Sequence, residues 1–354
     1  MRASLPRSWV FVDLADALAP GSVHSFELAG SPRVVYRTAG GDVLVADAHC
    51  PHVGTHLGQG GTVEGECIRC PLHGLRFTPD GACVEARARG GELRLAMYPT
   101  RVVAGMVFCW HDPAGGAPDF ELPELDAREF LPYRIRTERL ALPMEEPLEV
   151  HAVDVRHNTT LHREQGVEIV DPFTTDATST HASLVMRHPA TPAGRRMLRV
   201  LGFPDGYVET HVEVTTVGLG YQHIRSTVAA MDLVVNQFML AVPRTAEEID
   251  LHVVYSMRRL RRDGLPGLLR ALPLGLLEPM FERAGHGELM AATDEHLRMW
   301  TRKRHLSKPG LLDDEDDLRR YRAWVDGFYT TLGTEPARAG DRGSDQYWDA
   351  RLRG

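Results

Sequence analysis

The chain has 354 residues, a formal net charge of −8 at pH 7 and a hydrophobic content of 43%. This length accommodates two domains, and this composition excludes a mainly disordered protein. The negative charge argues against a nucleic-acid partner that is held by bulk positive charge. No run of about 18 to 20 apolar residues predicts a membrane span. The N-terminal residues lack the layout of a signal peptide, so we expect a cytoplasmic protein.

The first third of the chain is rich in glycine and in short β-like runs. Residues 34–37 and 43–46 flank a turn at Gly40, Gly41 and Asp42, a pattern that predicts a β-hairpin. We therefore expect a small all-β domain over residues 1–115. A segment rich in proline and glycine, 112–124, predicts a linker after it.

The remaining residues mix strand and helix patterns. Residues 207–214 alternate, with Val208, Thr210, Val212 and Val214 on one face, which predicts a half-buried strand. Further strands are expected at 233–242 and 249–257, and helices at 285–304 and 315–332. This order predicts an α+β domain with an antiparallel sheet over residues 116–334. Residues 335–354 are rich in glycine and arginine and predict a loosely ordered tail.

Two mixed cysteine–histidine pairs are the strongest motif. Cys50 and His52 form the first pair, and Cys70 and His73 form the second after 17 intervening residues. Two thiolates and two imidazoles suit a [2Fe–2S] cluster in which histidines bind one iron. A structural zinc site is the alternative. Zinc fingers usually group cysteine with cysteine and histidine with histidine, so the mixed pairs favour the cluster.

A second motif, Asp-x-x-His-x-x-x-x-His, is formed by Asp154, His157 and His162. Two histidines and a carboxylate can hold a mononuclear iron with open positions for O2 and substrate. Asp154 and His157 share a helix face. His157 and His162 lie about 140° apart on a regular helix, so they converge only if the helix bends or carries a π-type turn.

Together these motifs resemble the Rieske non-haem iron oxygenases. The segments CPHVGTHL and CPLHGLRF carry the resemblance, which extends over residues 9–329. The nearest groups are the oxygenase component of 3-ketosteroid 9α-hydroxylase and the cholesterol 7-desaturase (Neverland-type) enzymes, on the stretch from Trp300 to Tyr329. The resemblance implies a Rieske β domain joined to a helix-grip catalytic domain, in a head-to-tail homotrimer.

The resemblance also implies roles for single residues. His157 and His162 would bind the iron, and Asp154 would carry the electron from His73 of the neighbouring subunit. The sequence departs from relatives at two positions near these motifs. Leu75 stands where many relatives carry tryptophan, and His151 stands where relatives of the steroid group tend to carry asparagine.

The third iron ligand is the largest departure from the family pattern. Relatives carry an aspartate four residues before a late tryptophan, whereas His296 stands four residues before Trp300 here. Asp294 and Glu295 lie just before it. Either the site uses three histidines, or the register shifts so that Glu295 or Asp294 binds, or none of the three does.

The implied activity is that of a terminal oxygenase component. NAD(P)H-derived electrons would arrive through a flavin reductase, a ferredoxin or both, pass to the [2Fe–2S] cluster and then reach mononuclear Fe(II), which uses O2. The substrate would be bulky and apolar, steroid-like or a polycyclic natural product, and would be hydroxylated, desaturated or oxidatively cyclised. The alternatives are an aromatic-ring dioxygenase and a Rieske electron-transfer protein with a non-functional mononuclear site.

The resemblance implies an apolar substrate pocket between the sheet and the helices. The segment 265–281 would be a lid or a subunit contact. The candidate lining residues share apolar side chains on the predicted strands: Val170, Phe173, Leu184, Met186, Val212, Val214, Phe238 and Leu240.

Overall fold

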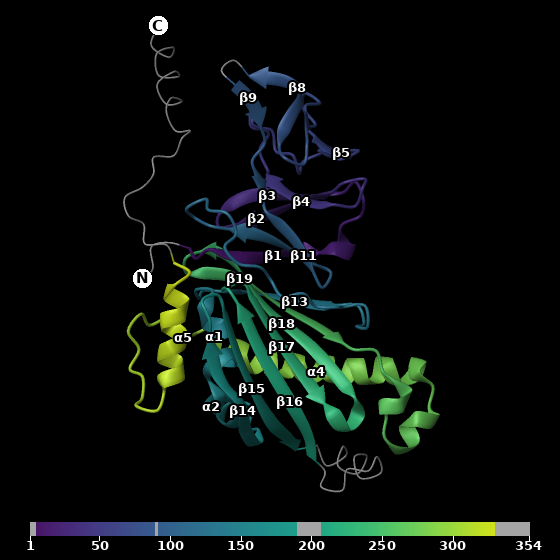
Figure 1. Ribbon diagram of the computed structural model, residues 1–354, viewed down its shortest axis with the longest axis vertical. Helices are drawn as coiled ribbons and strands as arrows, with labels where there is room; N and C mark the ends of the chain where they lie inside the picture. Colours follow the sequence, from purple (N-terminus) through teal and green to yellow (C-terminus); the bar gives the residue numbers. More distant parts are fainter. Residues whose placement is uncertain (1–4, 89–90, 190–206, 330–354) are drawn as a thin grey trace.

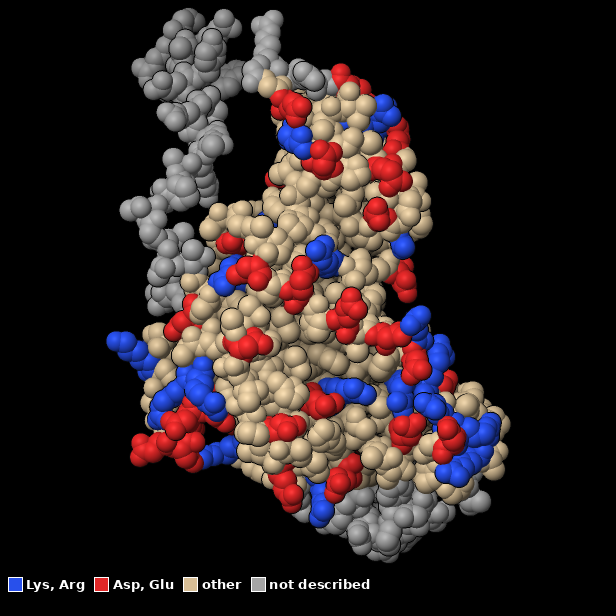
Figure 2. Space-filling model, viewed as in Figure 1, with Lys and Arg blue, Asp and Glu red and all other residues tan. Residues whose placement is uncertain are grey.

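The computed structural model describes residues 5–88, 91–189 and 207–329. The small N-terminal strands occupy one end of the molecule, and a large sheet with helices occupies the other (Figure 1). Basic and acidic side chains are interspersed over the face shown in Figure 2. Within the described ranges, no helix combines the length and hydropathy needed to cross a membrane. The tail predicted at 335–354 lies outside the described residues.

Three antiparallel sheets form the N-terminal part. The first sheet has the order β1 (Ser8–Leu14), β12 (Met106–His111) and β11 (Thr100–Val103). The second has the order β10 (Met97–Tyr98), β4 (Val43–Asp47), β3 (Ser31–Arg37) and β2 (Val23–Leu28). The third has the order β5 (Thr62–Glu64), β6 (Cys67–Arg69), β7 (Arg76–Phe77), β8 (Ala82–Ala88) and β9 (Gly91–Arg94). The predicted hairpin is confirmed, because β3 and β4 pair with Tyr36 opposite Leu44.

A seven-stranded antiparallel sheet forms the C-terminal part. Its order is β13 (Arg134–Leu140), β19 (Glu248–Met257), β18 (Leu233–Thr245), β17 (Tyr221–Val228), β16 (Tyr207–Val217), β15 (Ser179–Pro189) and β14 (Gln165–Thr175). The helices are α1 (Glu145–Val153), α2 (Val155–Thr160), α4 (Leu274–Trp300) and α5 (Asp316–Asp326). Short 3-10 turns cover Ala15–Ala17, Ala229–Met231, Arg262–Gly264 and Gly267–Ala271. The α+β prediction and the strands predicted at 207, 233 and 249 are confirmed.

The predicted helix at 285–304 begins earlier than expected. Helix α4 starts at Leu274, so that part of the segment predicted as a lid or contact is its first two turns. It runs across one face of the sheet and contacts β19 (Figure 1). Helix α1 contacts β15, β16 and β18 and is packed in turn against α5.

Strand register decides which side chains face these helices. Val214 pairs with Ile224, and Ile224 pairs with Gln237, so these three side chains share one face. Phe238 therefore points to the opposite face, where its ring stacks on His223 with centroids 4.7 Å apart. Leu240 shares that opposite face. The prediction that Phe238 and Leu240 line a pocket beneath the helices is wrong, because a one-residue step along a strand reverses the side chain.

The remaining predicted lining residues differ in burial. Val170 is 51% exposed on β14. The other five, Phe173, Leu184, Met186, Val212 and Val214, are buried in the main hydrophobic core.

The two parts of the molecule share one hydrophobic core. Trp9 of β1 donates its indole N–H to the carbonyl of Phe120 at 2.8 Å. The hydroxyl of Ser8 accepts from the backbone N–H groups of Leu219 and Gly220, both at 3.1 Å. The predicted linker at 112–124 has no regular structure, but Phe120 is buried within this core. The segment thus fixes the N-terminal part against the large sheet.

Helix α1 carries buried carboxylates that are paired with cations from later in the chain. Glu146 is 1% exposed and contacts Lys303 and His305, the latter at 2.6 Å. Glu149 accepts from the guanidinium of Arg322 at 2.9 Å. Burial raises the pKa of Glu149, and Arg322 offsets part of this effect. Because buried charges need partners, this network fixes α1 against α5.

We expect the substitution Arg322→Met to lower the free energy of unfolding by about 3–5 kcal/mol, because it leaves Glu149 buried without its partner. Arg322→Lys keeps the positive charge and should lose less. Chemical denaturation at neutral pH measures both. A loss below about 1 kcal/mol in the methionine variant would contradict a structural role for the pair.

Candidate metal centres

Two loops of the same geometry carry the mixed cysteine–histidine pairs. The Gly54 N–H donates to the Cys50 carbonyl at 2.9 Å, and the Gly74 N–H donates to the Cys70 carbonyl at 3.0 Å. Both glycines have positive φ, +78° and +73°, a conformation that other residues rarely adopt. The repeated turn gives the two loops the same backbone course, although the histidine follows the cysteine by two residues in the first loop and by three in the second.

The four side chains of these loops converge. Cys50 and Cys70 are each 1% exposed and contact one another, and the rings of His52 and His73 are 4.8 Å apart. Burial raises the pKa of Cys50. Two buried thiols beside two exposed imidazoles fit a [2Fe–2S] cluster whose metal ions displace the thiol protons. The histidine-bound iron would then lie on the solvent side.

The second motif lies where the helix breaks between α1 and α2. Asp154 has φ −87° and ψ 81°, outside the helical region, and its carboxylate accepts from the His157 N–H at 3.2 Å. The Asp154 carbonyl also accepts from Nδ1 of the His157 ring. A proton on Nδ1 leaves the lone pair of His157 on Nε2, free for a metal.

The turn that follows α2 brings the next histidine back toward His157. The His157 carbonyl accepts from the Leu161 N–H at 2.7 Å and from the His162 N–H at 3.4 Å. The second contact spans five residues and is the π-type turn that the spacing requires. The rings of His157 and His162 are accordingly 5.3 Å apart.

Helix α4 supplies His296, the third histidine of this cluster. This residue is 4% exposed, and its Nε2 lies 2.8 Å from Nε2 of His162. Its ring is 5.3 Å from that of His157 and stacks on Trp300 at 4.7 Å. Two ligands at right angles and about 2.1 Å from a metal lie about 3.0 Å apart, so the two Nε2 atoms are spaced as metal ligands require.

The two acids beside His296 have other partners. Glu295 accepts from Nδ1 of His162 at 2.8 Å. Asp294 forms an ion pair with Arg136 of β13 at 2.7 Å. Ligating histidines usually donate their second ring N–H to a carboxylate or carbonyl. Glu295 and the Asp154 carbonyl meet this condition for His162 and His157.

His151 of α1 also belongs to the cluster, and the sequence analysis did not count it as a ligand. Its ring is 4.9 Å from that of His296 and 5.8 Å from that of His157. One ring nitrogen from each of these three residues lies within 4.8 Å of the others. The sequence signal was a metal-binding residue type three residues before Asp154.

Burial favours the neutral form of three of these imidazoles. Burial and, to a smaller extent, the nearby His157 and His162 lower the pKa of His151 to about 3. The pKa values of His157 and His296 are also lowered, chiefly by burial. Neutral imidazoles keep the lone pairs that bind divalent metals, so the donor set fits a mononuclear iron.

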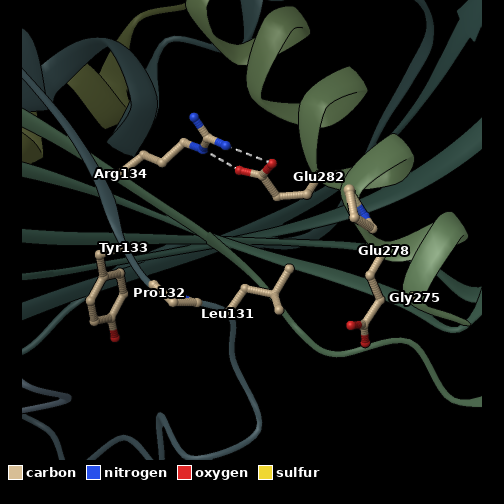
Figure 3. Close-up of a pocket in the computed structure, with 8 residues that line it drawn as sticks. Leu131, Pro132, Tyr133, Arg134, Gly275, Glu278 and Glu282 are labelled. Atoms are coloured by element: carbon tan, nitrogen blue, oxygen red, sulfur yellow. Dashed lines mark hydrogen bonds and ion pairs between the residues drawn. The ribbon is translucent and has the colours of Figure 1, made fainter.

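A separate cavity of about 390 Å³ lies between the start of β13 and the first half of α4 (Figure 3). Arg134 and Glu282 point toward each other across it and pair at 2.8 Å. Glu282 precedes His296 by 14 residues on α4, which corresponds to about 21 Å along a helix. The cavity is therefore not the space in front of the histidine cluster.

Comparison with known proteins decides the family. Residues 8–99 match the Rieske [2Fe-2S] domain, and residues 109–329 match the 3-ketosteroid 9alpha-hydroxylase C-terminal domain. The chain belongs to this family of Rieske oxygenases. The prediction of a Rieske non-haem iron oxygenase component, an oxidoreductase, is confirmed. Its cofactors are the [2Fe–2S] cluster and mononuclear iron, with O2 as co-substrate.

Individual relatives agree with this assignment. The chain is 26% identical to cholesterol 7-desaturase of Xenopus laevis, over 92% of this chain and 72% of that protein. It is 34% identical to the 3-ketosteroid-9-alpha-monooxygenase oxygenase component of Mycobacterium tuberculosis, over 36% of this chain and 35% of that protein. The crystal structure of dicamba monooxygenase bound to dicamba has the same fold, with a TM-score of 0.57, 16% identity and coverage of 91% and 96%.

Proposed function

We propose that this Rieske oxygenase is a monooxygenase for a bulky, apolar substrate of the steroid or polycyclic natural-product class. The imidazole cluster formed by α1, α2 and α4 carries this proposal, because it is partly buried and offers a site sheltered from water for O2 chemistry. Similarity to a 3-ketosteroid monooxygenase and a cholesterol desaturase supports the substrate class. The outcome is hydroxylation, desaturation or oxidative cyclisation.

The ligand assignment follows from the partners of each side chain. Cys50, Cys70, His52 and His73 hold the [2Fe–2S] cluster. His157, His162 and His296 hold the mononuclear iron, because their ring nitrogens converge while Asp294 is engaged by Arg136. Glu295 is a positioning residue that fixes the ring of His162.

When bound, the mononuclear iron supplies O2 activation at its open coordination positions. The protein contributes orientation and dryness. The Asp154 carbonyl and Glu295 fix the rings of His157 and His162. Trp300, 2% exposed, covers one face of His296 and excludes water from it.

Electron delivery requires a second subunit in this proposal. The sheet of the Rieske loops and α2 lie toward opposite ends of the molecule in Figure 1. A head-to-tail homotrimer would place His73 of one subunit beside Asp154 of the next, in a ring that closes. A flavin reductase, a ferredoxin or both deliver the NAD(P)H electrons. The five cysteines form no disulfide, and a reducing compartment keeps cysteines in the thiol form that a cluster needs. This supports a cytoplasmic location.

Substitutions at three successive positions of α4 test the ligand assignment. His296→Ala should lower the affinity for mononuclear iron more than about 100-fold, because it removes a ligand and not only a residue that orients one. Glu295→Gln should weaken iron binding about tenfold to hundredfold, the usual effect of losing a carboxylate that orients a ligating histidine. Asp294→Asn is the matched control and should bind iron as the unaltered chain does.

The measurement is iron per chain after anaerobic dialysis against a ferrous chelator, with cluster iron subtracted through acid-labile sulfide. Retention of iron by His296→Ala together with its loss from Glu295→Gln or Asp294→Asn would contradict the assignment and favour a carboxylate ligand.

Turnover under labelled O2 tests the reaction class. The full chain, supplied with NADPH and a ferredoxin–reductase pair, is expected to convert a member of a steroid and polycyclic panel. Hydroxylation should incorporate one labelled oxygen atom, and desaturation should remove two hydrogen atoms without label. Incorporation of both oxygen atoms would favour the aromatic-ring dioxygenase instead. A cluster that cycles without any product in the presence of bound iron would favour the electron-transfer protein.

A further inference from the structure

We propose that His151 is a fourth ligand of the mononuclear iron, so that this centre is bound by imidazole nitrogen atoms alone. The inference rests on the proposed function, since it concerns the same iron site. The sequence places His151 three residues before Asp154, and histidine is a residue type that binds metals strongly.

The position of His151 is the first support. The residue lies on the last turn of α1, directly before the break at Asp154, and it faces α4. Its ring centroid is nearer to that of His296 than the ring of His157 is, 4.9 Å against 5.3 Å. The three residues His151, His157 and His296 meet the distance requirement of a shared metal ion. His151 therefore lies within ligand distance of a metal held by His157 and His296, and His162 approaches the same point through His296, with the two Nε2 atoms 2.8 Å apart.

The second support is the way in which the protein leaves one ring nitrogen of His151 for a metal. Nδ1 of His151 is buried and has no hydrogen bond of good geometry among the described residues. The Pro147 carbonyl, one turn earlier on α1, is a weak hydrogen-bond partner of this ring. Ligating histidines usually donate one ring N–H to a carbonyl or a carboxylate and bind the metal with the other nitrogen. The Pro147 carbonyl meets this condition for His151.

The third support is that four carboxylates next to these histidines in the sequence have other partners. Glu295 is bonded to His162 and Asp294 to Arg136. The Asp154 carboxylate caps α2, and Glu149, two residues before His151, is paired with Arg322. Nitrogen donors are thus the ligands that this cluster offers.

An all-imidazole site has a consequence for its chemistry. Four neutral ligands leave the ferrous centre with its full charge of 2+, whereas a carboxylate would reduce this charge to 1+. They also leave two positions of an octahedral iron open, in place of three. The site should therefore differ from a site with two histidines and one carboxylate in its affinity for the metal and in its affinity for an added anionic ligand.

Cobalt substitution tests the proposal without reliance on activity. The mononuclear iron is removed from the full chain with a chelator that leaves the cluster intact, and Co2+ is added. Absorption at the cobalt K-edge then reports this site free of the cluster irons, and its imidazole scattering counts the histidine ligands. Competition with a metal indicator gives the affinity for Co2+. The variant is His151→Asn, and the control is His286→Asn, which removes an imidazole that contacts Tyr255 elsewhere on α4.

We expect four imidazoles on cobalt in the unaltered chain and in His286→Asn, and three in His151→Asn. The affinity for Co2+ should fall more than about 100-fold in His151→Asn, beyond the range for a residue that only orients a ligand. Three imidazoles in the unaltered chain, unchanged in His151→Asn, would overturn the proposal and leave the proposed function intact. If the unaltered chain bound no metal at this site, both would be overturned. The count in the unaltered chain decides the matter even if the variant fails to fold.

Discussion

The convergence of four partly or fully buried imidazoles at one point is the constraint on which this structure depends. His151, His157, His162 and His296 come from three elements, and their rings lie 4.6–5.8 Å apart in each contacting pair. Burial lowers the pKa values of His151, His157 and His296, and it leaves Nδ1 of His151 without a hydrogen bond of good geometry. A metal ion resolves this because it accepts several lone pairs at once. The interruption of the helix at Asp154 and the close approach of α4 are the geometric conditions for that arrangement.

The rest of the fold holds these elements in place. The seven-stranded sheet supports α1 on one face, and the buried ion pairs of Glu146 and Glu149 fix α1 against the chain after α4 and against α5. On the opposite face the sheet receives β1 of the N-terminal part, where Trp9 and Phe120 complete a shared core. One continuous core thus joins the domain that receives electrons to the domain that holds the iron.

Much of this could be predicted from local sequence. The Rieske loops depend on residues close together in the chain, so the spacing of Cys50, His52, Cys70 and His73 was informative by itself. The π-type turn before His162 followed from helical geometry. The third iron ligand could not be predicted, because it depends on the rotation of α4 about its own axis. Positions 294, 295 and 296 are equally polar, and only packing shows which of them faces the cluster. The faces of Phe238 and Leu240 depend on strand register, which alternation within one strand cannot supply. His151 was missed for a similar reason, since its relation to α4 exists only in the folded chain.

Low-temperature EPR of the anaerobically reduced protein, with and without nitric oxide, tests the central claim most directly. A chain with both metal centres is expected to give the signal of a reduced Rieske cluster and, with nitric oxide, the signal of a high-spin iron–nitrosyl. The second signal should disappear in His296→Ala while the first remains. A Rieske signal alone, after reconstitution of the unaltered chain with iron, would contradict the account, because the histidine cluster would then not be an iron site.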